Sequence, residues 1–424
     1  MNQQSPLETL LADRATRPQR AIPSICTAHP LAIEAALLRG LADDTPVLIE
    51  ATCNQVNQEG GYTGMTPAAF LSFVRDIAAR VGFDPRRIIF GGDHLGPNPW
   101  RKLPAGEAMA RASQMVQAYV AAGFEKIHLD TSMGCAGESA ALDDQITAPR
   151  AAELAVVVEK ASRSAARKPV YIVGTEVPPP GGAHGHLDAP QPTTADRASL
   201  TLATHREAFR KAGVEQAFER VIGLVVQPGV EFGNESVAIY DPQRARDLSE
   251  GRKRLGVTYE AHSTDYQPAT ALRALVDDGF GILKVGPGIT FALREALYGL
   301  DDIVDAFGRP TGLPSLKETM EQVMQSSPDS WRPYYPGDET EQRLLRHYSY
   351  SDRIRYYWNM SPAKAGVAAL LSFFGQRSIP ATLISQYLGR LHEPVVEGRL
   401  APTANALILA AMDEVLKPYA EACR

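Results

Sequence analysis

Residues 46–90, PVLIEATCNQVNQEGGYTGMTPAAFLSFVRDIAARVGFDPRRIIF, contain the repeating unit that decides the fold. A short apolar run at 46–50 is followed by a polar, glycine-containing segment and then by a helical pattern at 67–80. A second apolar run begins at residue 87. Strands buried on both faces read as continuous apolar runs, and their alternation with helices predicts parallel strands.

The same unit recurs from about residue 20 to residue 305. The chain has eight such apolar runs, at 21–26, 46–50, 87–90, 126–129, 170–173, 221–226, 257–259 and 282–285. Helical patterns lie between them, for example at 151–162 and 290–298. Eight β–α units close naturally into a (β/α)8 TIM barrel. The alternative is an open doubly wound sheet, but no GxGxxG turn follows the first run and no GxxxxGK[ST] loop occurs.

The last quarter of the chain has a different character. After about residue 312 the alternation ends, and 315–324 and 403–417 read as amphipathic helices. We therefore expect a barrel domain at 1–312 and a C-terminal helical extension at 313–424, packed on the barrel or on a neighbouring subunit. The Pro- and Gly-rich segment 177–194 lies within the alternation, so it is interpreted as a long loop after the fifth strand and a candidate lid.

Composition excludes several classes of protein. The 424 residues carry 43 Lys and Arg against 49 Asp and Glu, a net charge of −6, which argues against nucleic acid or an anionic membrane as partner. Four cysteines without a CxxC pair predict neither a disulfide framework nor a zinc ribbon. No apolar run approaches 18 residues and no basic-then-apolar leader is present, so a cytoplasmic location is expected.

Histidines gather where the strands of the predicted barrel end. Six of the nine lie at these ends or in the long loop: His29, His94, His128, His184, His186 and His262. The C-terminal ends of barrel strands meet at one mouth, so these side chains are expected to lie close together. Imidazoles and carboxylates on separate strands are the ligand types of zinc and related divalent ions. The sequence therefore predicts a metal site at the mouth.

His94 (GGDHLGP) and His262 (YEAHSTD) are the favoured metal ligands, with Glu176 (VGTEVP) as a third. The alternative at each position is a hydrogen-bonded histidine, or a carboxylate paired with Lys284. His29 and His128 are weaker candidates, because each can simply hydrogen-bond a neighbouring loop.

Asp93 directly precedes His94. A carboxylate at this place can move a proton on a hydroxyl of the substrate, which makes Asp93 a candidate general base. The alternative is an aspartate that caps the next loop.

The ends of the seventh and eighth strands predict an anion site. Small residues, hydroxyls and a helix N-terminus come together there, as in many barrel phosphate sites. The candidate phosphate-binding residues are Ser263, Thr264, Lys284, Gly286 and Gly288. A Gly/Pro turn with a capping threonine at Thr290 is the equally open alternative.

Several blocks of this sequence resemble one known family, the Z subunits of class II tagatose-1,6-bisphosphate aldolase. They include CTAHPLAIEAAL (26–37), LIEATCNQVNQEGGYTGMTP (48–67), FGGDHLGPN (90–98), GTEVPPPGGAH (174–184), YEAHSTDYQ (259–267), KVGPGITFALREAL (284–297) and YSDRIRYYW (350–358). Members have often carried the label tagatose-6-phosphate kinase. This chain has no recognisable nucleotide-phosphate motif to support such an activity.

The resemblance implies a metal site related to that of catalytic class II aldolases. Those enzymes have an Asp-His pair like Asp93-His94, a glutamate before a GG loop like Glu176, and a metal histidine opening a phosphate loop like His262. They carry a third metal histidine after the sixth strand, where this chain has Gln227. Glutamine is a weaker, neutral ligand. Either Glu176 completes the coordination or the site is altered, which argues against ordinary bisphosphate aldolase activity.

The resemblance also implies two functions. Some members support a separate aldolase subunit without catalysing a reaction; others interconvert D-tagatose 6-phosphate and D-fructose 6-phosphate by epimerisation at C4, in galactitol and tagatose catabolism. The charged barrel mouth favours the enzyme, with a divalent metal, zinc first and Mn²⁺, Ni²⁺ or Co²⁺ as alternatives. The expected partner is a small phosphorylated ketose; a homo-oligomer or an aldolase catalytic subunit stays open.

The expected chemistry is retro-aldol cleavage of C3–C4 followed by re-addition. The C4 hydrogen of a 2-ketose is β to the carbonyl and too weakly acidic for direct removal, and no dinucleotide motif supports a redox route. Asp93 is expected to take the C4 hydroxyl proton, and Glu176 or Asp265 to act on the opposite face.

Overall fold

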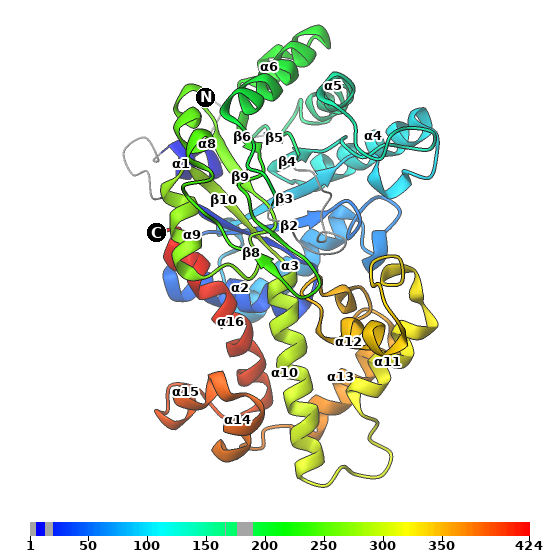
Figure 1. The fold of residues 1–424 in the computed structure, drawn as a ribbon, viewed down its shortest axis with the longest axis vertical. Coiled ribbons are helices and arrows are strands. Elements are labelled where there is room, and N and C mark those ends of the chain that lie inside the picture. Colours follow the sequence, from blue (N-terminus) through cyan, green and yellow to red (C-terminus); the bar gives the residue numbers. More distant parts are fainter. Residues whose placement is uncertain (1–5, 13–19, 166, 176–189) are drawn as a thin grey trace.

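Eight parallel strands close into a barrel at the centre of the molecule (Figure 1). The computed structural model describes residues 6–12, 20–165, 167–175 and 190–424. The barrel strands, in their order around the barrel, are β1 (Ile22–Cys26), β2 (Val47–Thr52), β3 (Ile88–Leu95), β4 (Lys126–Leu129), β5 (Val170–Val173), β6 (Val221–Val225), β9 (Thr258–Ala261) and β10 (Phe280–Val285). Every apolar run identified in the sequence lies on one of them, so the predicted (β/α)8 barrel is confirmed.

Strand β3 extends further than its apolar run. It continues through two glycines to Leu95, and Asp93 pairs in register with Thr52 of β2. A Cβ atom on Gly91 would lie 2.7 Å from Cγ of Glu50, so only glycine leaves room for that buried side chain. The register with β4 shifts between Gly92 and Leu95, and His94 has a φ of 49° there. Such bulges re-aim side chains, and strained backbone of this kind is concentrated at functional sites.

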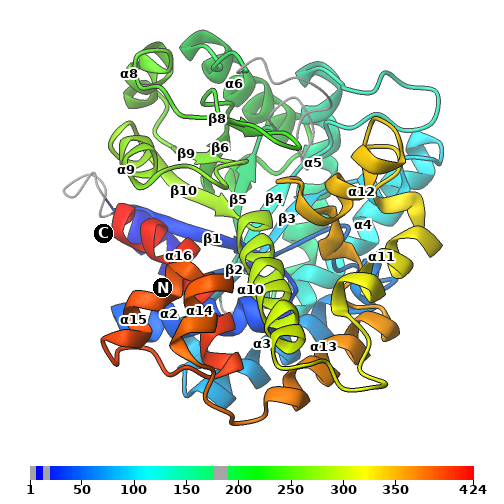
Figure 2. The same cartoon turned by 60° about the horizontal axis from the view of Figure 1, so that its bottom comes forward.

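Helices surround the barrel on its outer face (Figure 2). They are α2 (Pro30–Asp43), α3 (Pro67–Val81), α4 (Ala105–Ala122), α5 (Asp144–Ala161), α6 (Ala195–Lys211), α7 (Glu215–Phe218), α8 (Arg246–Gly251), α9 (Ala269–Asp277) and α10 (Pro287–Ala306). Local signals explain several boundaries: Thr66 and Thr194 accept N-cap hydrogen bonds, and Gly82 and Gly123 end helices in the left-handed conformation.

The end of the barrel opposite the strand C-termini is closed by the short helix α1 (Pro6–Ala12). Its Leu7 is fully buried in an apolar cluster inside the barrel, formed with Ile22, Leu48, Ile89, Val170, Ile172, Val225 and Ile282. Four of them, Ile22, Leu48, Ile89 and Val170, are the first or second residues of their strands. Filling one end with apolar side chains leaves the opposite end of the interior for polar ones.

The C-terminal region is helical, as predicted. Its helices are α11 (Leu316–Ser326), α12 (Glu339–Tyr348), α13 (Ser361–Phe374), α14 (Ala381–Tyr387), α15 (His392–Val396) and α16 (Ala404–Ala422). Helix α16 packs against α2, α9 and α10 (Figures 1 and 2), and the amide of Ala21 donates to the carbonyl of Cys423. The last helix thus joins the ring around the barrel. The division into domains at 312/313 stays a prediction.

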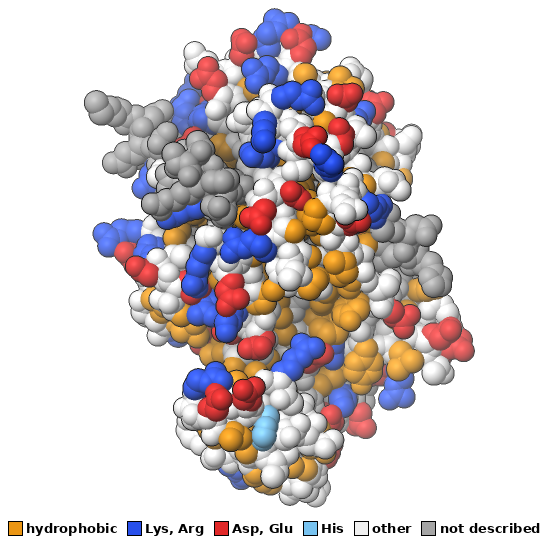
Figure 3. Space-filling model, turned by 60° about the vertical axis from the view of Figure 1, so that its left-hand side comes forward, with side chains coloured by type: hydrophobic (Ala, Val, Ile, Leu, Met, Phe, Trp, Pro, Cys, Tyr) orange, Lys and Arg blue, Asp and Glu red, His pale blue; other side chains and the backbone are white. Residues whose placement is uncertain are grey.

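A two-stranded antiparallel pair, β7 (Glu231–Phe232) with β8 (Val237–Ala238), follows β6 and was not predicted. In the part of the chain that the structure describes, no helix is both long and apolar enough to cross a membrane. On the face drawn in Figure 3, basic and acidic side chains are interspersed, and hydrophobic side chains gather in its lower half. The cytoplasmic location stays a prediction.

Candidate active site

A cavity of about 810 Å³ opens at the C-terminal ends of the barrel strands. Its lining includes seven of the residues that the sequence predicted for the site: Asp93, His94, His262, Ser263, Asp265, Lys284 and Gly286. It also includes residues of the C-terminal region that sequence reasoning missed: Asp329, Ser330, Tyr334, Arg353, Arg355 and Tyr356. The available signal for the second group was the block YSDRIRYYW, with two arginines among aromatic residues. The site is therefore built by the barrel and the extension together.

Three histidines meet at this cavity: His94 and His262 line it, and His128 is fully buried next to them. The ring centroids of His94, His128 and His262 lie 4.8 to 5.3 Å apart, and all three side chains are buried. One nitrogen from each ring and one carboxylate oxygen of Asp93 all lie within 4.8 Å of one another. His128, the weaker candidate on sequence, therefore belongs to the same group as the two favoured ligands.

Each of these rings is oriented by a protein oxygen. His94 Nδ1 lies 2.6 Å from Asp130 Oδ2, His262 Nε2 lies 3.0 Å from Glu260 Oε1, and His128 Nε2 lies 3.0 Å from the carbonyl oxygen of Gly174. Histidines that bind metals commonly donate their second N–H to a carboxylate or carbonyl in this way, which sets the tautomer. A metal here would be bound through the second nitrogen of each ring. For His128 this is Nδ1, which lies 3.2 Å from the amide nitrogen of His94 and 3.0 Å from Asp93 Oδ1, so it would exchange these contacts for the metal.

The protonation states of the cluster follow from burial and charge. Burial would raise the pKa of Asp93, but His94, Lys284 and His128 hold it well below its usual range. Burial lowers the pKa of His262 to about 3, so this ring is neutral at physiological pH and offers a lone pair. Burial also opposes the charge on His94, but the Asp93 and Asp130 carboxylates raise its pKa.

A layer of charged side chains fills the barrel below the histidines. Lys126 Nζ lies 2.6 Å from Glu50 Oε1 and 2.8 Å from Glu260 Oε2, and all three side chains are fully buried. Lys284 Nζ lies 2.6 Å from Glu50 Oε2 and 2.7 Å from Asp93 Oδ1. The sequence signal for this layer is a charged residue inside an otherwise apolar strand, as at Glu50, Lys126 and Glu260.

The position of Lys284 differs from its expected role. The sequence suggested that it would contribute charge to a phosphate site. Its ammonium group is instead committed to Glu50 and Asp93, whose carboxylates raise its pKa well above the usual value against the effect of burial. The sequence left open that a candidate carboxylate ligand instead pairs with Lys284. The carboxylates that pair with it in the structure are those of Glu50 and Asp93. Lys284 positions Asp93.

This donor set fits a divalent cation. Four buried carboxylates, of Glu50, Asp93, Asp130 and Glu260, face two buried ammonium groups, of Lys126 and Lys284. The carboxylates thus outnumber the ammonium groups by two. A proton on His94, whose pKa Asp93 and Asp130 raise, or a divalent ion would offset this excess. Nitrogen ligands with one carboxylate nearby are typical of zinc and related ions. Buried charge without a partner is costly, so this imbalance itself favours a bound cation.

Two other predicted ligands are not part of this group as described. Gln227 Oε1 accepts hydrogen bonds from the amides of Gly229 and Val230 at 2.8 and 3.0 Å, so its oxygen serves its own loop. A ligand role for Gln227 stays a prediction without support from these contacts. Glu176, His184, His186 and most of the candidate lid 177–194 lie outside the described residues.

The predicted phosphate loop already has protein partners for its donors. The amides of Gly286 and Gly288 donate to Asp265 Oδ1 at 3.0 and 2.7 Å. The Thr264 hydroxyl donates to the carbonyl of Lys284 at 2.6 Å. Ser263 and Gly286 line the cavity. The Asp265 carboxylate thus takes the place at the start of α10 where the sequence predicted an anion, and the phosphate role of these residues stays a prediction.

A second buried carboxyl group lies close by, on the extension. Asp352 has a φ of 47° and accepts a hydrogen bond of 2.6 Å from the Thr290 hydroxyl. Burial raises its pKa to about 7, against the opposing effects of Arg355, Thr290 and Arg294. Burial likewise raises the pKa of Asp265 to about 6.

The pKa of Asp352 predicts a pH-dependent stability. Its folded value exceeds the unfolded one, so its stabilising contribution is complete below about pH 4 and is lost as pH rises toward 7. We expect this group to lower the free energy of unfolding by about 1.4 kcal/mol per pH unit in that range. Asp352→Asn keeps an acceptor for Thr290 and should remove this slope. Urea unfolding between pH 4 and 8 tests it; equal slopes for the two proteins would contradict the assignment.

Comparisons with known proteins agree with the resemblance seen in the sequence. A family model for the D-tagatose-1,6-bisphosphate aldolase subunit GatZ/KbaZ-like proteins matches residues 7–424. A curated protein of Agrobacterium fabrum (strain C58), named D-tagatose 6-phosphate 4-epimerase, is 54% identical over 417 residues, covering 97% of each chain. A crystal structure of a protein from Sinorhizobium meliloti 1021, described as a probable tagatose 6 phosphate kinase, is 56% identical, with a TM-score of 0.89, over 95% of this chain and 100% of its own.

Proposed function

Since the chain belongs to the family of D-tagatose-1,6-bisphosphate aldolase subunit GatZ/KbaZ-like proteins, we propose that it is an isomerase, a D-tagatose 6-phosphate 4-epimerase. It would interconvert D-tagatose 6-phosphate and D-fructose 6-phosphate. One observation carries the proposal: the barrel mouth holds a buried carboxylate, Asp93, against three histidines, in a chain 54% identical to a protein of that name. The proposed retro-aldol route would use a bound cation and a proton acceptor.

We assign the metal to His94, His128 and His262, with zinc as the first candidate and Mn²⁺, Ni²⁺ or Co²⁺ as alternatives. When bound, the ion would polarise the C2 carbonyl of the ketose. Glu176 stays a candidate for a further ligand or for an acid–base group. The contacts of His94 with Asp130 and of His262 with Glu260 hold the rings in the orientation that this site needs.

Asp93 is the proposed general base. Its carboxylate is ionised at neutral pH, lies 2.7 Å from Lys284 Nζ and accepts a hydrogen bond of 3.3 Å from the Cys26 thiol. Asp93 would take the C4 hydroxyl proton while the C3–C4 bond breaks, giving a three-carbon enediolate and glyceraldehyde 3-phosphate. Rotation of the aldehyde and re-formation of the bond on its other face inverts C4. Glu176 or Asp265 would give a proton to the C4 oxygen on that face.

The test is an assay of the purified protein alone, loaded with metal. D-tagatose 6-phosphate is supplied, and D-fructose 6-phosphate is followed by a coupled assay. Turnover is expected. The second candidate, a non-catalytic subunit of a class II aldolase, is favoured by the description of the family. It predicts no turnover, together with stimulation of an added D-tagatose-1,6-bisphosphate aldolase catalytic subunit.

Isotope labelling separates the mechanisms. In the retro-aldol route the hydrogen on C4 stays on the aldehyde carbon, so product formed in deuterated water should carry no solvent deuterium at C4. Removal of that hydrogen as a proton would instead introduce the label. We also expect trace triose phosphate from aldehyde that escapes. Deuterium at C4, measured by NMR or mass spectrometry, would exclude the proposed mechanism and leave the assigned activity intact.

A further inference from the structure

The C-terminal segment brings two arginine side chains to the wall of the active-site cavity. Arg353 and Arg355 both line it, next to the end of β10 and the start of α10. Within the described part of the chain, neither guanidinium forms an ion pair with a carboxylate. A partly buried cation without a salt-bridge partner, facing a cavity, is a candidate site for an anionic ligand.

The two arginines differ in burial and in the contacts that their guanidinium groups make. Arg353 is buried, its Nε donates to the carbonyl of Ser330, and its guanidinium lies 3.3 Å from the ring centroid of Tyr334. Its contacts are those of a packing residue. Arg355 is only partly buried, and it lines both the large cavity and a second, smaller one.

Arg355 is held firmly on one side of its guanidinium. Nη1 donates to the carbonyls of Ser351 at 2.5 Å and Asp352 at 3.0 Å, and Nη2 donates to the Tyr356 hydroxyl at 2.9 Å. Among the described residues, Nε–H and one Nη2–H have no protein acceptor. An arginine fixed in this way is oriented before any ligand arrives, so little side-chain entropy is lost on binding.

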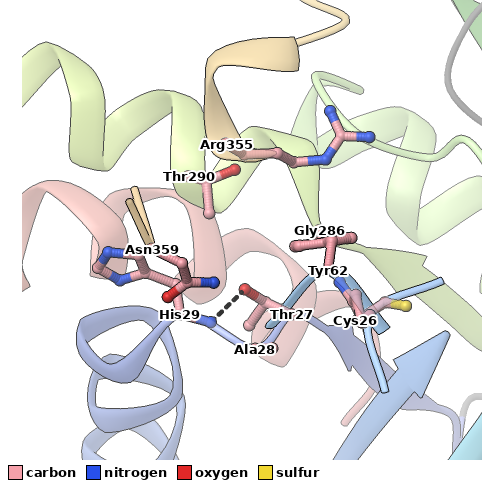
Figure 4. A pocket seen from close by; sticks show the side chains of 10 residues that line it. Cys26, Thr27, Ala28, His29, Tyr62, Gly286, Thr290, Arg355 and Asn359 are labelled. Carbon is pink, nitrogen blue, oxygen red and sulfur yellow. Dashed lines mark hydrogen bonds between the residues drawn. The ribbon is translucent and has the colours of Figure 1, made fainter. Parts of the chain in front are cut away.

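Arg355 also lies where a second, smaller cavity of about 20 Å³ meets the large one. In Figure 4, Arg355 and Thr290 lie on one side of this small cavity, and Cys26, Thr27 and His29 from the end of β1 lie on the other. Gly286 lines both cavities. Arg355 therefore reaches the same corner of the mouth where the loop donors of Gly286 and Gly288 are already used by Asp265.

Two buried carboxyl groups near Arg355 do not cancel its charge. Asp265 and Asp352 act on it at a distance, but neither forms an ion pair with it in the described structure. Burial raises the pKa of Asp265 to about 6 and of Asp352 to about 7, so near neutral pH Asp265 is mostly ionised and only Asp352 loses a substantial part of its charge.

We propose that Arg355 binds the phosphate group of the substrate, at the mouth of the small cavity that it shares with the large one. The inference rests on the proposed function and extends it, because it makes the helical extension part of substrate recognition. The phosphate end of the ketose would contact Arg355, and the C1–C4 end would reach Asp93 and the histidines of the same cavity.

The test compares Arg355→Gln with wild type on D-tagatose 6-phosphate and on unphosphorylated D-tagatose. We expect KM for the phosphorylated sugar to rise by about 100-fold, as expected for two charge-assisted hydrogen bonds, with kcat changed only a few-fold. Activity on D-tagatose should be unchanged, so the preference for the phosphorylated sugar collapses. Arg355→Lys should be intermediate. Arg343→Gln, an exposed arginine of α12 outside the cavity, is the matched control and should behave as wild type.

Equal losses on both sugars would overturn the inference and make Arg355 a structural residue. If Arg355→Gln does not fold, the lysine variant gives the same comparison, because it keeps the charge and loses the bidentate geometry. If wild type turns over neither sugar, the proposed function fails, and calorimetric titration with D-tagatose 6-phosphate decides the inference separately. Wild-type binding that Arg355→Gln loses would support it; equal binding by both proteins would refute it.

Discussion

Replacing Asp93 with asparagine is expected to lower the rate of epimerisation by roughly 10³-fold or more. The amide has almost the same shape as the carboxylate but cannot accept the C4 hydroxyl proton. The three histidines remain, so bound metal should stay near the wild-type level. Both the epimerase rate and the trace of triose phosphate should fall together, since cleavage of C3–C4 needs the same base. The coupled assay, single-turnover measurements and elemental analysis test these three points.

A matched control for Asp93 is Asp196→Asn, the same chemical change at an exposed position in the first turn of α6. It should retain wild-type activity. The assignment of Asp93 would be wrong if Asp93→Asn kept more than about a tenth of the wild-type rate, because loss of a general base costs at least about 10²-fold. Loss of metal from Asp93→Asn would make Asp93 a ligand as well as a base, since its oxygen lies within 4.8 Å of the ring nitrogens.

Removing a histidine of the cluster should release the metal. His94→Ala is expected to weaken metal binding by at least about 100-fold, and to abolish activity in parallel, because a lost ligand costs more than the 10- to 100-fold typical of an outer partner. The ring contacts Asp130 and lies at the cavity surface, so the barrel should stay folded. Elemental analysis after dialysis and circular dichroism measure the two properties separately. Undiminished metal in this variant would remove His94 from the site.

The identity of the third ligand can be decided in the same experiment. His128→Ala should match His94→Ala in metal loss, because the cluster brings the two imidazole rings to a centroid distance of 4.9 Å. Gln227→Ala should keep the metal, because Gln227 Oε1 is bound to two backbone amides. If His128→Ala kept the metal and Gln227→Ala lost it, the third ligand would be Gln227. This residue follows the sixth strand, where related aldolases are expected to carry a histidine.

The sequence by itself determined the fold of this protein and the end of the barrel at which its candidate site lies. Eight apolar runs alternating with helical patterns specify parallel strands, and parallel strands in a closed barrel present all their C-terminal ends at one mouth. Asp93, His94 and His262 could be placed at that mouth because each lies within four residues of the end of such a run. The end of each apolar run can be read directly from the chain, so no tertiary information was needed to identify the residues there.

Only the tertiary structure decided which of these side chains touch. The bulge in β3 and its register with β4 bring His94 against His128, whereas Gln227 turns into its own loop. Register and side-chain direction depend on packing between strands that are distant in sequence, and hydrophobic periodicity carries no information about them. Lys284 could be placed at the mouth from sequence, but its choice of Glu50 and Asp93 as partners required the three-dimensional distances. The same holds for Arg355, which reaches the site through the packing of the extension against α10.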